Sequence, residues 1–283
     1  MRPEGDPAAL GELLRSRRGR LTPADVGLPP GERRRTPGLR REEVALLANL
    51  SPTYYTFLEQ GRQVRPSPQV LDALAAALRL DGAERQYLDV LAHGRPGAHP
   101  APDGRSEPPP EVLAAGVADL VQRLDPHPTF VKGRRWDVLA ANAAARELFT
   151  DWEARPAADR NLVRWMFTDG HARQVYLDWE HEARAMLGRF RLATASHTHD
   201  PSIAALIEEL QRDSEHVRRW WPNHDVVSIG ASGVKRLRHP RLGPVGYAHV
   251  VLSVTDQPAQ TLVTYHAQPD SPSPRPTSMP GVN

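Results

Sequence analysis

The first third of the chain repeats its apolar residues every three or four positions, which is the spacing of amphipathic helices. A first helix carries Leu10, Leu13 and Leu14, and two more are predicted over 67–80 and 81–92. Between the first of these helices and the one over 67–80 lies the run RREEVALLANLSPTYYTFLEQGR, residues 40–62. Its spacing predicts two short helices packed around a tight turn. This part of the chain is therefore expected to be all-α.

The pattern is mixed beyond residue 110. We expect a helix over 111–124, two short strands near 129–132 and 136–140, a helix beginning near Asn142, and several helices between 161 and 221. After Trp221 the period becomes two in the runs DVVSIGAS, VKRLRH, VGYAHVVLSV and QTLVTYHA. These four runs predict an antiparallel meander, so the second part of the chain is expected to be α+β.

Two proline-rich stretches set the expected domain boundaries. Residues 93–110, HGRPGAHPAPDGRSEPPP, hold too few apolar side chains to pack and are expected to form a flexible linker. Residues 269–283 have the same character and are expected to be a disordered tail. The chain is therefore expected to fold as one domain over 1–92 and a second domain over 111–268.

The local signals in residues 40–62 agree with a helix-turn-helix. Asn49 stands at the turn, where a positive φ is commonly needed, and Asn tolerates it. Ser51 and Pro52 are typical of the start of a helix, and Gly61 is typical of its end. The side chains that the pair is expected to bury are Val44, Ala45, Leu47, Leu50, Tyr55 and Leu58.

Positive charge is concentrated around this helix pair. Residues 1–95 hold 15 Lys and Arg against 12 Asp and Glu, whereas the rest of the chain holds 21 against 22. Such clustering fits a surface that faces DNA phosphates, and the alternative is a solvated basic face. A second helix of this kind can enter a major groove. The candidate DNA-binding residues are Thr53, Tyr54, Thr56 and Phe57 toward the bases, with Arg33, Arg34, Arg35, Arg40, Arg41 and Arg62 toward phosphates.

The run GLPPGERRRTPGLRREEVALLANLSPTYYTFLEQGR, residues 27–62, resembles the Xre-type helix-turn-helix class and, more closely, the MmyB-like regulators of actinobacteria. The resemblance implies a lambda-repressor-like N-terminal fold and a function in transcription regulation. Phe57 departs from the family pattern, because that position is usually Arg. One DNA contact of the family is therefore not expected in this chain.

Residues 129–149, TFVKGRRWDVLAANAAARELF, look like the opening of a PAS domain, in which two strands precede an Asn that starts a helix. MmyB-like regulators carry such a domain after their DNA-binding unit, and this chain resembles them further in RNLVRWMF, YLDWEHEAR, HDP, RRWWPNHDV and HPRLG. The resemblance covers residues 10 to about 268. It implies a PAS-like α+β domain with a pocket suited to fatty acids or similar lipids.

Large aromatic side chains are concentrated in the second part, where all six Trp of the chain lie. Most rings in a domain of this size form plain core, whereas some line ligand cavities. Arg164 and Arg134 are alternatives for pairing with an acidic headgroup. The candidate ligand-binding residues are Trp136, Phe149, Arg164, Trp165, Phe167, Trp179, Phe190 and Trp220.

Catalytic and metal chemistry find little support in the sequence. The absence of Cys excludes a disulfide scaffold, a thiolate zinc site and a cysteine nucleophile. The cluster at His197, His199 and Asp200 precedes a proline at a helix end, where such residues usually serve as caps. HExxH, GxSxG and phosphate-binding glycine motifs are missing. We expect no catalytic residue, no metal, and no cofactor beyond a bound lipid or fatty acid.

The chain also lacks an apolar run of 18 residues and a signal-like N-terminus, so we expect a soluble cytoplasmic protein without a membrane partner. The expected function is that of a homodimer on a two-fold operator, with a ligand that shifts its affinity for DNA. Coupling across a flexible linker requires contacts between the domains. The alternative is a ligand-binding or metal-dependent enzymatic domain with a helical module that recruits protein partners.

Overall fold

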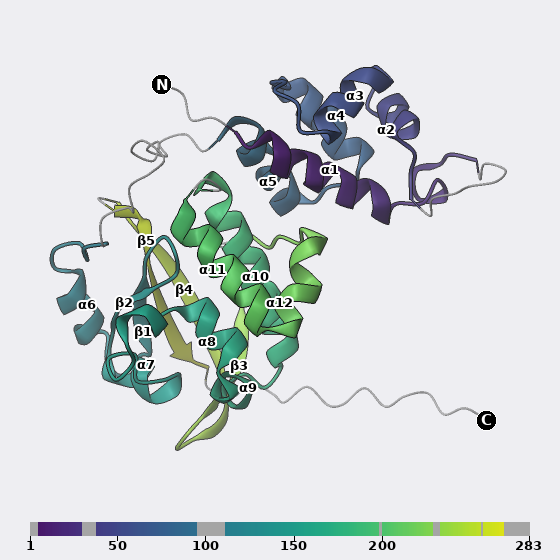
Figure 1. Ribbon diagram of the computed structural model, residues 1–283. Coiled ribbons are helices and arrows are strands. Elements are labelled where there is room, and N and C mark those ends of the chain that lie inside the picture. Colours follow the sequence, from purple (N-terminus) through teal and green to yellow (C-terminus); the bar gives the residue numbers. More distant parts are fainter. Residues whose placement is uncertain are drawn as a thin grey trace, which may run out of the picture.

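The computed structural model describes residues 5–29, 38–94, 111–197, 200–228, 233–255 and 257–268. Its N-terminal domain is all helical, as predicted, and forms the upper lobe in Figure 1. Its elements are α1 (Pro7–Arg20), the 3-10 turn η1 (Ala24–Val26), α2 (Arg41–Leu47), α3 (Pro52–Glu59), α4 (Pro68–Ala77) and α5 (Gly82–His93). The tail over 269–283 lies outside the described residues, as does the linker after its first two residues.

The N-terminal core forms where the apolar faces of these helices meet. Helix α1 packs against α3 and α5, and α2 packs against α3 and α4. Side-chain caps fix several helix starts: Asp6 accepts a hydrogen bond from the Ala9 amide, and Asp81 and Glu84 form a reciprocal capping box at α5. The residues buried most completely are Leu13, Leu14, Val44, Ala45, Tyr55, Leu71, Leu74, Leu88 and Leu91.

The C-terminal domain combines helices with a five-stranded antiparallel sheet, in agreement with the α+β prediction. Its first elements are α6 (Val117–Arg123), β1 (Thr129–Lys132), β2 (Val138–Ala141), α7 (Ala143–Leu148), η2 (Ala157–Asp159), α8 (Leu162–Thr168) and α9 (Gly170–Val175). There follow α10 (Trp179–Thr194), η3 (Ala195–His197), α11 (Pro201–Asp213), α12 (Glu215–Trp220), η4 (Trp221–Asn223), β3 (Val234–His239), β4 (Gly243–Val254) and β5 (Gln257–Ala267). Within the described residues, no helix is both long and apolar enough to cross a membrane.

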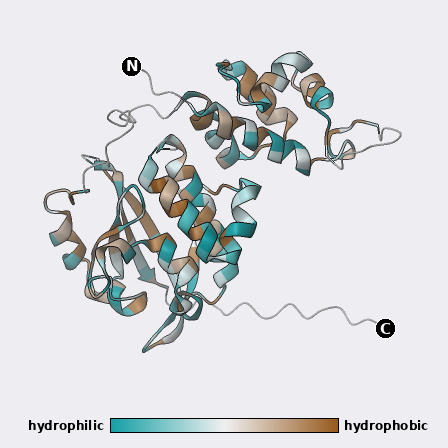
Figure 2. Ribbon diagram, viewed as in Figure 1, coloured by the Kyte–Doolittle hydropathy of each residue, from teal (hydrophilic) through white to brown (hydrophobic). Residues whose placement is uncertain are grey.

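The strand order is β2-β1-β5-β4-β3, so the last strand lies in the middle of the sheet. The predicted meander is present as β3, β4 and β5. Strand β5 also pairs with β1, and the paired residues Thr129 and Thr264 are 135 positions apart in the sequence. The large helices cover one face of the sheet, whereas α6 packs on β1 and β2 from the other (Figure 1). Hydropathy colouring shows the apolar residues concentrated where helices and strands face one another (Figure 2).

Two expected elements differ from the structure. The helix predicted over 111–124 begins only at Val117, because Gly116 adopts a left-handed conformation (φ 75°) that interrupts a right-handed helix. The run DVVSIGAS is not a strand over residues 225–228, and its residues 229–232 lie outside the described part. The Val226 side chain packs instead into the core of the N-terminal domain.

The two domains are in contact with each other. The cluster of buried side chains in the N-terminal domain also includes Leu192, Ala195 and Val226 of the C-terminal domain. Helix α5 contacts η3, directly after α10. The N-terminal domain is therefore packed against α10 and the segment that follows α12.

Candidate functional site

The helix-turn-helix forms as its local signals predict. Asn49 has a φ of 53° at the turn between α2 and α3, and Gly61 has a φ of 69° after α3. The Ser51 hydroxyl accepts a hydrogen bond from the Tyr54 amide at 3.1 Å, which caps α3. Ala45 is fully buried where the two helices cross. These features fix the orientation of α3 relative to α2.

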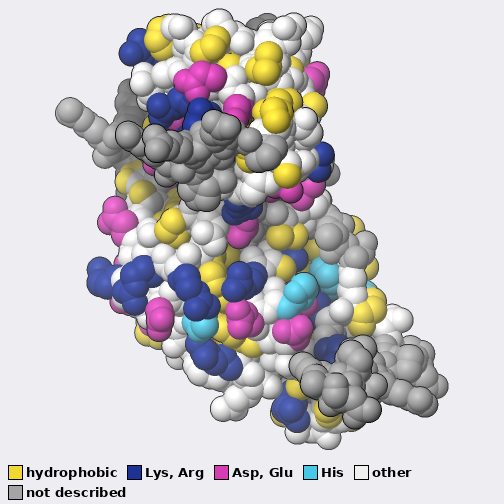
Figure 3. All heavy atoms as spheres, turned by 90° about the vertical axis from the view of Figure 1, so that its right-hand side faces the viewer, with side chains coloured by type: hydrophobic (Ala, Val, Ile, Leu, Met, Phe, Trp, Pro, Cys, Tyr) yellow, Lys and Arg dark blue, Asp and Glu magenta, His cyan; other side chains and the backbone are white. Residues whose placement is uncertain are grey.

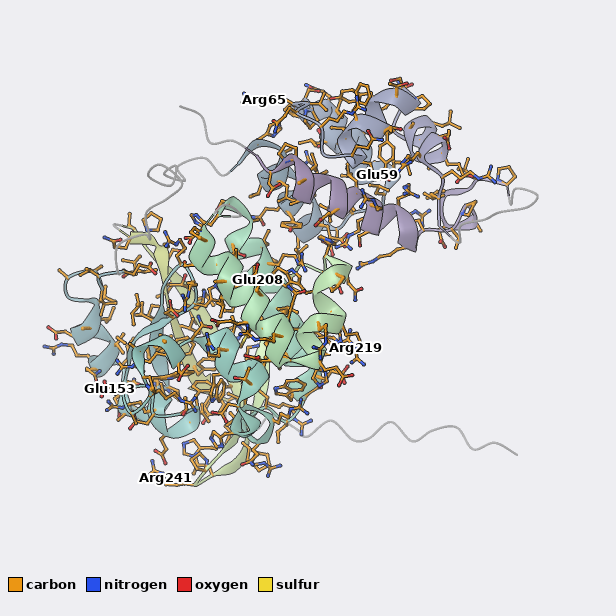
Figure 4. All side chains as sticks on the ribbon, in the orientation of Figure 1. Glu59, Arg65, Glu153, Glu208, Arg219 and Arg241 are labelled. Carbon is orange, nitrogen blue, oxygen red and sulfur yellow. The ribbon has the colours of Figure 1, made fainter. Side chains whose placement is uncertain are left out.

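A buried carboxylate joins the three helices behind this motif. Glu59 at the end of α3 accepts two hydrogen bonds from Arg18 of α1, at 2.7 and 2.9 Å, and one from Arg41 at 2.9 Å. Burial opposes ionisation of Glu59, but the bonds from Arg18 and Arg41 outweigh it and lower the pKa of this carboxyl. The Glu59 side chain is visible between the helices in Figure 4. Sequence reasoning missed this ion-pair network, because it joins residues 41 positions apart.

The N-terminal half of α3 is turned toward solvent. Thr53 is exposed, and Tyr54, Thr56 and Phe57 are partly exposed. Tyr54 also packs against the core, so only part of its ring is available for an outward contact. Thr56 donates its hydroxyl hydrogen to the Pro52 carbonyl. The face that sequence reasoning assigned to DNA is thus an accessible surface made of hydroxyls and two aromatic rings.

Arginines flank this face. The Arg62 guanidinium lies 4.1 Å from the centre of the Phe57 ring, and its Nε donates to the Gln60 side chain at 3.1 Å. A cation therefore stands beside Phe57, the position at which the sequence departs from its family pattern. Arg40 and Arg41 lie at the start of α2, with Arg41 bound to Glu59. Arg33, Arg34 and Arg35 lie outside the described residues.

The C-terminal domain contains a cavity of about 50 Å³ between the sheet and α10. Apolar side chains make up much of its wall, and the helix contributes Met186 and Arg189. The volume admits a few water-sized groups, well below the roughly 300–1,000 Å³ of pockets that hold drug-sized ligands. The full lining is Phe130, Lys132, Trp136, Leu162, Tyr176, Met186, Arg189, Lys235, His249, Val251, Val263 and Tyr265.

Lys132 brings a buried amine into this cavity, and the Glu111 carboxylate partly offsets its charge without forming an ion pair. It is 7% exposed, its Nζ lies 3.9 Å from the centre of the Trp136 ring, and within the described residues no carboxylate reaches it at ion-pair distance. Burial, followed by repulsion from Arg189, lowers the pKa of Lys132 to about 7. A buried cation of this kind favours an anionic partner.

Two further cations of the cavity share one acid. The Lys235 ammonium is bound to Glu182 of α10, and Arg189 lies 3.9 Å from the same carboxylate. His249 adds an imidazole whose Nδ1 lies 3.0 Å from the Gly233 carbonyl, and burial lowers its pKa. Lys132, Lys235 and Arg189 therefore line the cavity, and the carboxylates that act on them are Glu182 and Glu111.

Of the eight candidate ligand-binding residues, Trp136 lines this cavity. Trp165 packs edge to face against Phe149 and Trp152 in the core, and Phe149 is stacked on Tyr176. Phe190 is fully buried and stands edge-on behind Trp136, with ring centroids 5.5 Å apart. These rings are core because they fill the space between the sheet and the helices with one another.

The aromatic rings of Phe167, Trp179 and Trp220 contact one another in the same core, where Phe167 and Trp220 are buried and Trp179 is partly buried. The Trp179 indole donates to the Met166 carbonyl at 3.1 Å, and arginines lie over two of the rings, Arg173 over Trp179 and Arg184 over Trp220. Figure 3 looks at the molecule from the right-hand side of Figure 1, where α12 lies, and shows basic, acidic and His side chains intermixed over the C-terminal domain. The rings of Phe167, Trp179 and Trp220 therefore pack in the core and do not line the cavity.

The two arginines considered for a headgroup have partners inside the protein. Arg164 is bound to Glu209 of α11, and Arg134 pairs with Asp200 at 3.0 Å. Asp200 also caps α11 through the Ser202 amide, so its role is structural. The histidine cluster around it forms no metal site within the described residues, and His199 lies outside them.

Sequence reasoning missed the cavity's cations, although one signal was present. The chain contains 34 Arg and two Lys, and both lysines line the cavity. In β3 the buried positions alternate as Lys235, Leu237 and His239, which places a lysine on the same side of the strand as a leucine. A charged residue at an inward strand position is the pattern that marks such a site.

Comparison with known families was made for the whole chain. Residues 113–276 match the family described as MmyB-like transcription regulator ligand binding domain, which is more than half of the chain. Residues 9–88 match a family described as helix-turn-helix domain. Among curated proteins, no sequence matches this chain.

Proposed function

Since the chain belongs to the MmyB-like transcription regulators, we propose that it reads a specific DNA operator through α3 and responds to a small apolar acid bound in its C-terminal domain. Membership of this family shows that the protein is a DNA-binding regulator with a ligand-binding domain. The operator contacts and the chemistry of the ligand are the parts proposed here. The proposal gives the protein no catalytic role.

The observation that supports DNA reading is the accessible N-terminal half of α3. Thr53 and Thr56 offer hydroxyls for base edges, and Tyr54 and Phe57 offer rings for thymine methyl groups. Arg62 stands beside these rings, and the basic residues Arg40 and Arg41 begin the preceding helix. In a homodimer, two such helices would read half-sites about 34–36 Å apart on one face of the duplex.

The DNA proposal is tested by selecting an operator from a random DNA library with the full-length protein. Thr53→Ala with Tyr54→Ala is expected to reduce the preference for the selected operator over random DNA, while Arg34→Ala with Arg35→Ala weakens binding to both alike. Arg212→Ala, which removes one exposed arginine on α11, serves as the control and should change binding to neither DNA. An equal loss on both DNAs for the Thr53 and Tyr54 variant would contradict the assignment of the reading helix.

The salt dependence of binding separates DNA recognition from recruitment of a protein partner. Six to ten phosphate contacts lower the affinity by about 10³- to 10⁵-fold between 50 and 200 mM salt. A hydrophobic contact with a protein partner lacks this dependence. A flat salt response of the wild-type protein would therefore refute DNA binding through the arginines.

The ligand proposal is supported by the charge and the walls of the cavity. The buried amine of Lys132 favours binding of an anion. The same cavity is lined by the apolar side chains of Phe130, Trp136, Met186 and Val263. A carboxylate at one end of an aliphatic chain meets both requirements. The element order of the domain, with two strands, several helices and three strands, supports a PAS-like architecture. We therefore propose a fatty acid or a similar monoanionic lipid as the ligand.

The ligand is sought first by mass spectrometry of small molecules that remain bound through native purification. Direct binding of dodecanoate is then measured by calorimetry at pH 6.0 for the wild-type protein, Lys132→Met and the control Arg241→Met, an exposed arginine of the same domain. We expect Lys132→Met to weaken binding at least tenfold and Arg241→Met to leave it unchanged. Equal affinities of Lys132→Met and the wild-type protein would refute the role of the amine.

A further inference from the structure

The contact between the two domains is built on one short segment. The carbonyl of Asn223 accepts hydrogen bonds from Ser16, Arg17 and Arg20 of α1, and Arg17 also donates to the His224 carbonyl at 2.7 Å. Asp225 pairs with Arg20 at 2.6 Å. We call residues 221–226, with the α1 side chains they bind, the interdomain latch. Arg17 is 3% exposed, whereas Arg20 and Asp225 are about half exposed, so the latch has one desolvated contact and a solvent-exposed rim.

Helix α10 holds this segment in place from the C-terminal side. Arg191 donates to the Trp221 carbonyl, lies 3.8 Å from the centre of the Trp221 ring, and contacts His224 Nδ1 at 3.2 Å. Burial and the nearby arginines lower the pKa of His224 to about 4, so its imidazole is neutral at pH 7 and can accept this bond. Arg191 also interacts with Tyr87 of α5, directly across the domain boundary.

The same helix forms a wall of the ligand cavity. Met186 and Arg189 line the cavity, and Glu182 one turn earlier holds Lys235 of the sheet. Arg189 and Arg191 are separated by one residue, which is about 3 Å along a helix axis. A displacement of α10 at the cavity must therefore also move the groups that hold the latch.

The cavity is too small for the proposed ligand as it stands. Its volume of about 50 Å³ admits a headgroup but not an aliphatic chain of a dozen carbons. The sheet side of the cavity is fixed by continuous strand pairing among β1, β5, β4 and β3. The helices contribute Leu162 of α8 and Met186 and Arg189 of α10, so α10 supplies the larger part of the helical wall.

We propose that ligand entry and the interdomain latch are coupled through α10: binding of a monoanionic lipid displaces the helix, opens the latch and releases the helix-turn-helix domain from its fixed orientation. This regulation rests on the proposed ligand class. The coupling is reciprocal, because a ligand that favours the open latch must bind more tightly wherever the latch is weakened.

The test combines ligand affinity with a distance measurement on the full-length protein. The chain has no Cys, so spin labels can be placed at Gln69→Cys on α4 and Glu208→Cys on α11, both exposed (Figure 4 shows Glu208). Electron-electron resonance then reports the distance between the domains with and without dodecanoate. We expect dodecanoate to shift the distance distribution to longer values.

Asp225→Asn weakens the latch without entering the cavity or the N-terminal core. Asp225 is about half exposed and pairs with Arg20, so its loss is expected to tighten dodecanoate binding about 2- to 5-fold. Asp213→Asn, a similarly exposed acid at the end of α11, is the matched control and should leave the affinity unchanged. Thermal melts of both variants confirm that they are folded.

The outcomes separate the two proposals. Dodecanoate binding without a change in distance, or equal affinities of Asp225→Asn and the wild-type protein, overturns the coupling and leaves the ligand proposal standing. Absence of dodecanoate binding to the wild-type protein overturns the ligand class and the coupling together. A longer distance with tighter binding by Asp225→Asn supports both.

Discussion

Replacement of Lys132 by Met is expected to make the C-terminal domain more stable while it destroys the anion site. A lysine pKa lowered from 10.5 to about 7 corresponds to roughly 5 kcal/mol of unfavourable interaction with the protonated amine, at 1.36 kcal/mol for each pKa unit. Structural relaxation and water entry reduce this value, and replacements of buried ion pairs by apolar side chains range from neutral to stabilising by about 1–4 kcal/mol. Met has nearly the length of Lys and fits the apolar surroundings of Trp136.

The pH dependence of this gain follows from the direction of the pKa change. Below about pH 7 the amine is protonated in both the folded and the unfolded protein, and the folded protein bears the full penalty. Between about pH 7 and 10.5 the unfolded chain binds more protons than the folded one, so the stability of the wild-type protein rises with pH. The advantage of Lys132→Met is therefore largest at pH 6 and shrinks toward pH 10.

Chemical denaturation followed by Trp fluorescence at pH 6.0 and pH 9.5 measures this difference, since all six Trp lie in the C-terminal domain. Lys235→Met is the informative comparison, because Lys235 is bound to Glu182 and its loss leaves that carboxylate with Arg189 alone. This second variant is expected to be destabilised. A Lys132→Met protein that is less stable than the wild type at pH 6.0, or equally stabilised at both pH values, would refute the reasoning.

Three further predictions concern stability and DNA binding. Glu59→Gln is expected to lower the free energy of unfolding of the N-terminal domain by about 2–3 kcal/mol. This loss is smaller than for a fully buried ion pair, because Arg18 and Arg41 keep access to water. Calorimetric melts measure it, with Asp72→Asn as the control. Asn142→Ala is expected to cost about 2–4 kcal/mol, because its side chain bonds the Thr129 and Ala145 amides and the His127 carbonyl, and an unchanged denaturation midpoint would contradict this. Arg62→Ala is expected to reduce the slope of log affinity against log salt by about one in DNA-binding titrations, whereas a parallel slope would remove Arg62 from the phosphate contacts.

The helix-turn-helix could be predicted from the sequence because its determinants are local. Asn49, Ser51 and Gly61 each act within a few residues of their own positions, and the structure confirms all three. The Asn142 cap was predictable for the same reason. Such signals depend on backbone conformation and capping, which a short window of sequence specifies.

The cavity of the C-terminal domain could not be predicted in the same way, because it depends on which strands lie side by side. Lys132 of β1, Lys235 of β3 and His249 of β4 meet only after β5 has entered the sheet between β1 and β4. Aromatic residues drew attention instead, and most of them, such as Trp165, are core. The rarity of lysine in an arginine-rich chain was the one compositional signal, and it required no knowledge of the strand pairing.

The central position of β5 has a consequence for the synthesis of this protein. A nascent chain leaves the ribosome with α1 to α5 first, and their short-range contacts allow them to fold while translation continues. The sheet forms later, because β1 can pair with β5 only after residues 257–267 have emerged. A truncated product that stops before residue 257 would contain the helix-turn-helix domain but would lack the central strand of the C-terminal sheet.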